Sequence, residues 1–311
     1  MPGTLIFRCF GILFLATAGS PMLPPRDLQI LHSVAHYDTL TRAQVNRLHF
    51  PGDDGRITRK RLKILLALGL LNQTSMRVVN PAVNGGVSAP VYYPSARGTT
   101  FLNEGRDAVA DALVLNAECP NWLFLYHFVA VAETHIMLDA AAKLRADVRV
   151  ACWYGERAIR DPKEKEPEKK YRLYQCVSGE DKQRVVCVPD AGFLLEKAGH
   201  RKVFYLEQDR DTTKSADRVA ASKCGGFAGL HARQLHRRAF PETNVDKFTV
   251  LMLAPTENRR DALRASVRKH PGADLWKFAS LTDVRPESFL AGAIWYPCEG
   301  EPKPLVQGGS S

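Results

Sequence analysis

Acidic residues in two strand-like runs are the first candidates for chemistry. Residues 188–194 form an apolar run that contains Asp190, and residues 203–210 form a second run that contains Glu207 and Asp209. Acidic side chains are rare in buried strands because they pack poorly there. Their presence in these runs therefore needs an explanation other than core packing. An unpaired acid cluster in a half-buried site is costly, so a metal ion or basic partners must accompany it. The two runs therefore predict a site.

Helices and strands alternate around these acids. Alternation in the run that holds Glu207 sends Tyr205, Glu207 and Asp209 to one face of a strand. On the helix that follows, Lys223 shares a stripe with apolar Phe227, so we expect it to point back at the sheet, where an acid is its natural partner. The expected order of elements in this part of the chain is a helix over 122–144, strands over 148–156, 184–196 and 203–209, a helix over 214–224, a strand over 248–254, a helix over 257–269 and a strand over 275–281.

Three local signals refine this order. Pro189 predicts an irregularity in its strand, just before Asp190. Thr212 or Thr213 is expected to cap the helix that carries Lys223. Gly225 and the glycine after it are expected to loosen or break that helix.

The amino-terminal third has the pattern of three helices followed by a hairpin. Helices are expected over 26–37, 42–48 and 56–71, with Thr41 as the N-cap of the second, and the hairpin joins 74–79 to 91–94. This order is typical of a winged helix-turn-helix domain, which places its third helix in the major groove of DNA.

The third helix is densely basic on its polar side. Its expected contacts with phosphates and base edges are Arg56, Thr58, Arg59, Lys60 and Lys63. Two other interpretations stay open: the basic run is a solvated helix face, or the domain binds protein instead of DNA.

Composition agrees with a polyanionic partner. The chain has 311 residues, a formal net charge of +10 and a pI near 9.3, and such a balance favours nucleic acid. Its seven cysteines are scattered without a Cys-x-x-Cys pair, which argues against a disulfide framework and a zinc ribbon and for reduced cysteines in the cytoplasm.

The sequence divides into five expected segments. The apolar run from Leu5 to Ala18 is interrupted by Arg8 and is too short to span a bilayer, and translation is expected to begin at Met22. No later segment is expected to span a membrane. The segments are a leader or mis-assigned start at 1–22, a winged-helix domain at 23–96, a connecting helical region at 97–120, an α/β domain at 121–296 and a flexible tail at 297–311.

Other familiar chemistry is missing from the sequence. It has neither a Gly-rich phosphate loop ending in Lys-Ser/Thr nor a nucleophile elbow. His127 and His135 share one face of the helix over 122–144, but eight residues separate them by about 12 Å, too far for one metal ion. Both are interpreted as core or polar-network histidines.

The order of elements and several short motifs together resemble the replication-relaxation family of bacterial plasmids and mobile elements. The resemblance runs from about Leu23 to Trp295 and implies a winged helix followed by a mixed-sheet domain with the restriction-endonuclease-like PD-(D/E)xK fold. It rests on residues 40–45 with Leu48 and Phe50, Arg61-Leu62, Gly69-Leu70-Leu71, the helix around His127, residues 189–192 and residues 206–210.

In that nuclease fold, the resemblance implies Mg²⁺ bound by Asp190 and Glu207, and a lysine two residues after the second acid that activates water. Asp209 occupies the lysine position, so the usual hydrolytic machinery is incomplete. Lys223 or Lys214 is a candidate replacement, and Glu133 or Glu156 a candidate for completing the metal shell. The opposing interpretation is that Asp190, Glu207 and Asp209 pair with Arg210, Arg218 and Lys223 in a fold that has lost catalysis.

Three functions follow from these patterns. The first is a DNA-binding accessory protein of plasmid or mobile-element replication or mobilisation, with double-stranded DNA and other replication or mobilisation proteins as partners. The second is a Mg²⁺-dependent nuclease that uses Asp190, Glu207, Asp209 and Lys223. The third is a protein-interaction adaptor that does not bind DNA.

Overall fold

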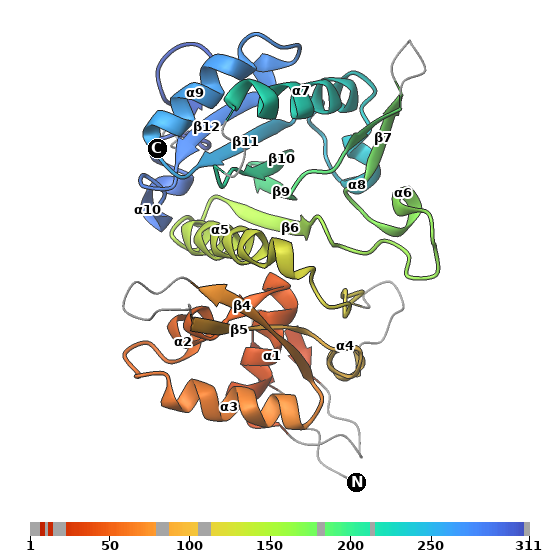
Figure 1. Cartoon of the computed structure of the whole chain (residues 1–311), viewed down its shortest axis with the longest axis vertical. Helices are drawn as coiled ribbons and strands as arrows, with labels where there is room; N and C mark the ends of the chain where they lie inside the picture. The colour runs from red at the N-terminus through yellow and green to blue at the C-terminus, as the bar shows by residue number, and fades with distance from the viewer. Residues whose placement is uncertain are drawn as a thin grey trace. The chain divides into compact units, whose positions relative to one another are not determined.

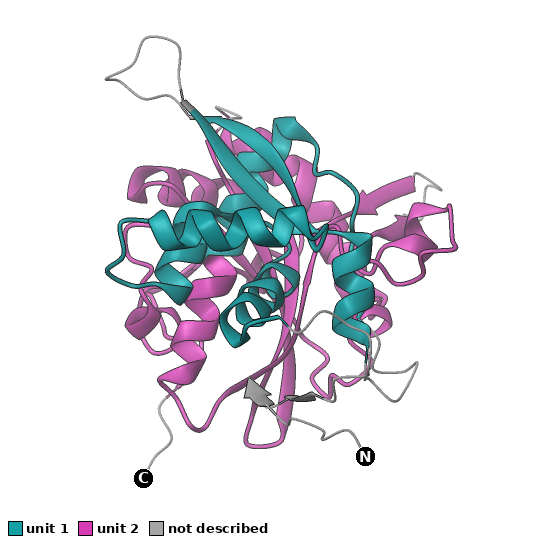
Figure 2. Ribbon diagram, turned by 90° about the horizontal axis from the view of Figure 1, so that it is seen from below, with its two compact units in different colours: residues 1–133 teal, residues 134–311 magenta. Residues whose placement is uncertain are grey.

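The computed structural model describes residues 7–9, 12–14, 23–78, 87–104, 113–178, 184–211 and 215–307. The chain forms two compact units, unit 1 at residues 1–133 and unit 2 at residues 134–311 (Figure 2). Outside the described residues lie most of the expected leader, the tip of the expected hairpin at 79–86, residues 105–112 of the expected connecting region, Lys214 with the two threonines before it, and residues 308–311.

Unit 1 contains the three expected helices and the hairpin, which joins a three-stranded antiparallel sheet in the order β3-β5-β4. Within the expected leader, the described residues form two short paired strands, β1 (Phe7–Cys9) and β2 (Ile12–Phe14). The other elements are α1 (Pro25–Tyr37), β3 (Leu40–Thr41), α2 (Arg42–His49), α3 (Arg56–Ala67), β4 (Leu71–Val78), β5 (Val87–Pro94), α4 (Ala96–Asn103) and the 3-10 helix η2 (Trp122–Phe124).

Local signals explain where the first helices begin. Thr41 caps α2 in a capping box with Gln44, as its sequence position predicts. At the start of α3, Gly55 adopts a positive φ of 85°, and the Asp53 carboxylate accepts hydrogen bonds from the main-chain nitrogens of Gly55 and Ile57. The turn between α2 and α3 is therefore fixed by residues 53–55.

Unit 2 is built on a six-stranded mixed sheet in the order β13-β12-β11-β10-β9-β6 (Figure 1). Strands β10, β11 and β12 are parallel, and the remaining pairs are antiparallel. The sheet strands are β6 (Arg149–Gly155), β9 (Ala191–Lys197), β10 (His200–Gln208), β11 (Thr249–Ala254), β12 (Trp276–Ser280) and β13 (Tyr296–Pro297). Each of the five strand regions expected from the sequence contributes a strand to this sheet.

The strand expected over 184–196 is two strands. β8 (Arg184–Cys187) pairs with β7 (Gln175–Ser178) in a separate two-stranded sheet, and β9 begins only at Ala191. Pro189 lies between them, where its missing N–H interrupts the ladder. This break places Asp190 at the entry to β9.

Helices cover both faces of the six-stranded sheet. One face carries α7 (Ala216–Ala232) and α9 (Glu257–Val267), which pack against each other. The carboxy-terminal half of α5 (Leu125–Lys143) contacts the other face, where Thr134 bonds Gln208 at 2.9 Å and His135 stacks on Trp153 at 4.1 Å between ring centroids. Shorter helices complete the unit: α6 (Pro167–Lys170), α8 (His236–Ala239), η3 (Ala273–Leu275) and α10 (Pro286–Phe289).

The segment Trp122–Lys143 corrects one expectation. By length and composition alone, it is long and apolar enough to cross a membrane. No such segment was expected from the sequence after the amino-terminal run. A helix that covers a sheet in a protein core passes the same test. Within unit 2, this helix buries Leu138 and Ala141 and forms the polar contacts of Thr134 and His135.

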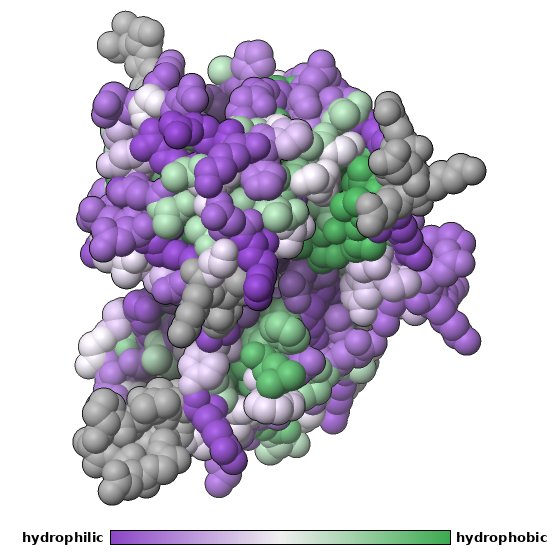
Figure 3. All heavy atoms as spheres, turned by 45° about the horizontal axis from the view of Figure 1, so that its top comes forward, coloured by the Kyte–Doolittle hydropathy of each residue, from purple (hydrophilic) through white to green (hydrophobic). Residues whose placement is uncertain are grey.

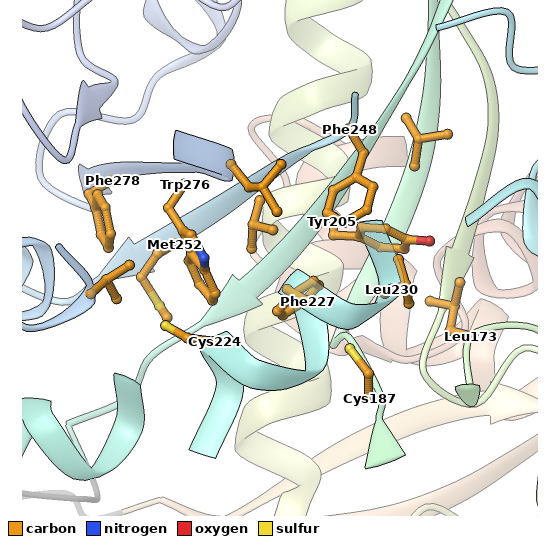
Figure 4. Close-up of a cluster of buried hydrophobic side chains, with 14 of the residues drawn as sticks. Leu173, Cys187, Tyr205, Cys224, Phe227, Leu230, Phe248, Met252, Trp276 and Phe278 are labelled. Carbon is orange, nitrogen blue, oxygen red and sulfur yellow. The ribbon is translucent and has the colours of Figure 1, made fainter. Parts of the chain in front are cut away.

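The main core of unit 2 lies between α7, α9 and the sheet (Figure 4). Tyr205 is central: its ring packs against Phe227 at 5.7 Å and edge-on against Phe248 at 5.0 Å. Trp276 packs edge-on against Phe227 at 5.1 Å. These aromatic contacts fix α7 over β10, the strand that carries Glu207.

Helix α7 is continuous through its glycines, which corrects the expected break. A Cβ at Gly226 would lie 3.1 Å from Cys187 Cβ, and one at Gly229 would lie 2.3 Å from Val177 Cγ1, whereas one at Gly225 would meet nothing within 4 Å. The glycines thus allow α7 to approach β7 and β8 closely. The helix begins at Ala216 with Ser215 as its N-cap.

The expected flexible tail is packed as far as the described residues reach. β13 pairs with β12, Lys303 bridges to Trp295, and Val306 is 6% exposed and donates its N–H to Leu290. The apolar side chain of Val306 is buried, which explains why this segment packs against the rest of unit 2. Figure 3, which brings the α7 and α9 side of unit 2 forward, shows hydrophilic residues over most of that side, with smaller hydrophobic patches among them.

Candidate functional site

Asp190 and Glu207 lie at neighbouring positions on adjacent strands. The register of β9 and β10 pairs Ala191 with Leu206, so the next position on each strand is Asp190 or Glu207. The main-chain nitrogen of Gln208 donates to Asp190 Oδ2 at 2.7 Å, which fixes that carboxylate at the strand entry. The break at Pro189 therefore directs one acid toward the other.

Lys223 of α7 completes this group. Its Nζ lies 2.6 Å from Glu207 Oε2 and 4.0 Å from Asp190 Oδ1. The expectation that Lys223 points back at the sheet toward an acid is confirmed. We use the name acid–lysine cluster for Glu156, Asp190, Glu207 and Lys223.

Burial makes the charges of the acid–lysine cluster interdependent. The side chain of Glu207 is 3% exposed, that of Asp190 11% and that of Lys223 33%. Burial by itself lowers the pKa of Lys223, but the carboxylates of Glu207 and Asp190 outweigh it and hold that pKa above its ordinary value. The ammonium group is therefore charged, and it stabilises two acids that would be costly to bury alone.

Glu156 is a third carboxylate at the same place. Its main-chain nitrogen donates to the carbonyl oxygen of Asp190 at 2.9 Å, and a carboxylate oxygen of Glu156 lies within 4.8 Å of one of Asp190. Glu133, the other expected addition to a metal shell, belongs to unit 1, where Arg47 Nη2 donates to its carboxylate at 2.7 Å.

Asp209 has a different partner. Arg259 of α9 donates from Nε to Asp209 Oδ2 at 2.7 Å and from Nη2 to Oδ1 at 3.3 Å. Both side chains are more than nine-tenths buried. Asp209 thus shares the α7–α9 face of the sheet with Glu207, as its position predicts, but it pairs with α9 while Glu207 pairs with α7.

Sequence reasoning missed Arg259, although a signal was present. Arg259 stands in the first turn of α9, where the helix dipole disfavours a cation. A buried cation at such a position needs a nearby acid, and the acid is Asp209. The side-chain hydrogen bond with Asp209 outweighs burial and raises the pKa of Arg259. Of the basic partners expected for the acids, the structure brings Lys223 to the site, while Arg218 is exposed near the start of α7.

The donor set of the acid–lysine cluster fits a hard divalent cation. Mg²⁺ prefers oxygen ligands and usually takes one or two carboxylates, and Asp190 and Glu207 offer them on adjacent strands. Lys223 stands against the Glu207 oxygen that would bind such an ion. The same residues thus suit a metal site and a closed ion-pair network.

In unit 1, α3 presents a row of exposed cations. We use the name α3 basic face for Arg56, Arg59, Lys60 and Lys63, all of which are exposed. The apolar side of the helix buries Leu62 and Leu65 in the core.

Two further residues of α3 lie away from the α3 basic face. Thr58 is 0% exposed and donates to Asn46 Oδ1, so it does not reach solvent, and its expected contact with DNA is corrected. Arg61 turns toward α1, where its Nη1 lies 3.4 Å from Asp27 Oδ2. The spacing of Thr58 from Leu62 and Leu65 puts it on the inward side of the helix.

The protein is thus a mixed α/β protein with an exposed basic helix in unit 1 and a buried acid–lysine cluster in unit 2. The model of the replication-relaxation family matches residues 31–243, more than half of the chain. The chain belongs to the replication-relaxation family, as its resemblance implied. Comparison with the curated proteins and with the solved structures gave no match.

Proposed function

We propose that this protein is a DNA-binding accessory protein that acts in the replication or mobilisation of a plasmid or mobile element. The family supports a role in one of these processes. The observation that carries the DNA-binding part is the α3 basic face, in which four cations stand on the solvent side of one helix. Clustered Lys and Arg side chains on a helix attract the phosphates of a duplex.

The arrangement of unit 1 supports a winged helix-turn-helix. Three helices precede a hairpin whose strand β5 also pairs with β3, and the turn at residues 53–55 joins α2 to α3. In such domains the helix after the turn enters the major groove. The α3 basic face is on that helix, so its cations are suited to contact the DNA backbone and base edges.

The test is DNA binding by the full chain on random and plasmid-origin duplexes. Replacing Arg59, Lys60 and Lys63 with alanine is expected to weaken binding strongly. The matched control removes three exposed cations from unit 2, Arg268, Lys269 and Arg285, and is expected to retain most of the affinity. Equal losses of DNA affinity in both triple variants would show that binding depends on the overall charge of the protein and not on α3. Failure of the wild type to bind DNA would favour the protein-interaction adaptor instead.

A second function, a Mg²⁺-dependent nuclease, is favoured by the position of Lys223. The lysine that usually follows the second acid on its strand is replaced by Asp209, and a lysine from α7 instead reaches both Asp190 and Glu207. Mg²⁺ held by the two acids would polarise a phosphodiester and supply a nucleophilic water, while the charged Lys223 would orient that water.

The nuclease is tested by incubating supercoiled and linear DNA with the wild type in Mg²⁺ or Mn²⁺. If it cleaves, Glu207→Gln and Lys223→Met are expected to abolish cleavage while leaving DNA affinity within about twofold, and Glu301→Gln, at an exposed acid in unit 2, is expected to cleave like the wild type. Intact DNA under all conditions would leave the acid–lysine cluster as an ion-pair network in a DNA-binding protein.

A further inference from the structure

Three arginines from separate segments of unit 2 meet beside α6 and α8. Arg160 follows β6, Arg172 follows α6 and Arg238 lies in α8, and both helices lie on the same side of unit 2 (Figure 1). Arg160 Nη2 donates to the carbonyl oxygen of Arg172 at 3.2 Å and to that of Arg238 at 3.4 Å. We use the name arginine cluster for these three residues.

Main-chain carbonyls and an aromatic ring hold the guanidinium groups in place. Arg172 Nε donates to the carbonyl oxygen of Ile159 at 3.2 Å, and its guanidinium lies 4.7 Å from the centre of the Tyr154 ring. Within the described residues, the other N–H groups of the Arg160 and Arg172 guanidinium groups have no hydrogen-bond partner. The cluster is thus preorganised, and most of its donors are not used by the fold.

Positive charge exceeds negative charge at this place. In the described part of the chain, the arginine cluster pairs with one carboxylate, that of Glu168, which lies 3.4 Å from Arg238 Nη1. The pKa of Arg160 is lowered by burial and then by the charges of Arg172 and Arg238, which Glu168 opposes only in part. Mutual repulsion of held cations is relieved by a bound anion.

We propose that the arginine cluster binds the phosphodiester backbone of a nucleic acid, so that unit 2 as well as unit 1 contacts DNA. Planar guanidinium groups bind phosphate oxygens through paired hydrogen bonds. Several such groups together are better matched to a ligand with many phosphates than to a ligand with a single carboxylate. This inference rests on the proposed DNA-binding function and deepens it by assigning a second contact surface.

The arginine cluster lies close along the chain to the acid–lysine cluster. The main chain of Glu156 is bonded to Asp190 in the acid–lysine cluster, and Arg160 follows four residues later. Four residues span at most about 14 Å, and phosphates of one DNA strand advance by about 3.4 Å each along the helix axis. The main chains of Glu156 and Arg160 are therefore no farther apart than the rise of about four nucleotides.

The experiment measures how DNA affinity depends on salt for the full chain. Arg160→Gln combined with Arg238→Gln is expected to reduce the slope of log K against log salt by about two, because each lost phosphate contact removes about 0.9. Arg238→Gln alone, at a side chain that is 57% exposed, is expected to reduce it by about one. This single variant tests the proposal even if loss of the Arg160 contacts prevents folding. The control, Arg268→Gln with Lys269→Gln, is expected to keep the wild-type slope.

A second readout locates the contact directly. Phenylglyoxal modifies accessible arginines, and bound duplex DNA is expected to protect Arg160, Arg172 and Arg238 at least fivefold while Arg268 stays reactive. One outcome would overturn this inference and leave the proposed function standing. In that outcome the wild type binds DNA and alanine at Arg59, Lys60 and Lys63 weakens binding, but the arginine-cluster variants keep the wild-type salt slope and DNA does not protect the cluster from phenylglyoxal. Equal protection by inorganic phosphate or by an acidic polypeptide at matched charge would also overturn it. If the wild type binds no DNA, the proposed function itself fails.

Discussion

Lys223 Nζ lies 2.6 Å from Glu207 Oε2, and this contact joins α7 to the middle of the sheet in unit 2. Glu207 lies on β10, an interior strand, where its carboxylate is almost fully buried. A buried carboxylate needs a cation, and the cation is supplied by a helix instead of by the strand itself. The pair therefore links the stability of unit 2 to the residues that would bind a metal ion.

Removing Lys223 is expected to destabilise unit 2. Lys223→Met leaves Glu207 and Asp190 buried without their cation and should lower the free energy of unfolding by about 3 kcal/mol, while Glu207→Gln in the same chain should restore much of it. Chemical denaturation measures this. The matched control is Lys269→Met, which removes an exposed partner of Asp217 and should cost less than about 1 kcal/mol. Equal small losses in both variants would show that the buried pair does not support the fold.

The glycines of α7 have different expected roles although they are close in sequence. Gly229→Ala places a methyl group against Val177 and should destabilise the protein by about 1–3 kcal/mol. Gly225→Ala meets no atom within 4 Å and should stabilise by about 0.5–1 kcal/mol through helix propensity. Val177→Ala combined with Gly229→Ala should recover part of the loss. Thermal unfolding compares the variants, and a stabilised Gly229→Ala would contradict the close approach of α7 to β7.

His49 is expected to make unit 1 sensitive to acid. Burial, and then the charge of Arg26, lowers the pKa of His49 from 6.5 to about 4, and its ring bonds Ser33 Oγ at 2.9 Å. Between pH 6.5 and pH 4 the unfolded chain takes up a proton that the folded chain does not. The free energy of unfolding should therefore fall with decreasing pH, by up to about 1.4 kcal/mol per pH unit from this residue, and the contribution fades as the pH rises above 6.5.

The comparison between wild type and His49→Gln isolates that contribution. Denaturation at pH 7.5, 6 and 5 should show a shallower pH dependence for the variant, and NMR titration of the wild type should show a ring that stays neutral to below pH 5. A His49 ring that titrates near its ordinary pKa of 6.5 would contradict this expectation.

The regular elements of this fold were largely predictable from sequence because their apolar patterns are long. The strand over 248–254 is buried along its whole length in β11, and the alternation around Glu207 sends Tyr205 into the core and Gln208 toward α5. Lys223 was predictable because a lysine on an otherwise apolar stripe needs an acid. Each of these signals is local to one element.

What the sequence did not predict depends on contacts between distant segments. The hairpin of β7 and β8 consists of four-residue strands, too short for a clear period. Gly225 and Gly226 have the composition of a helix break, and only the close packing of Gly226 against Cys187 explains that glycine. From sequence alone, Thr58 is a candidate for a contact in the DNA major groove, because a threonine suits both a DNA contact and a buried hydrogen bond. Only the packing of its helix shows which of the two it forms.

The salt dependence of DNA binding tests the central claim, that the α3 basic face contacts a duplex. The variant with alanine at Arg59, Lys60 and Lys63 should show a slope of log K against log salt that is smaller than the wild-type slope by about three. Thr58→Val, which removes a buried hydrogen bond, should lower stability and leave the slope unchanged. A wild-type slope in the triple variant, with DNA still bound, would show that α3 does not contact the duplex.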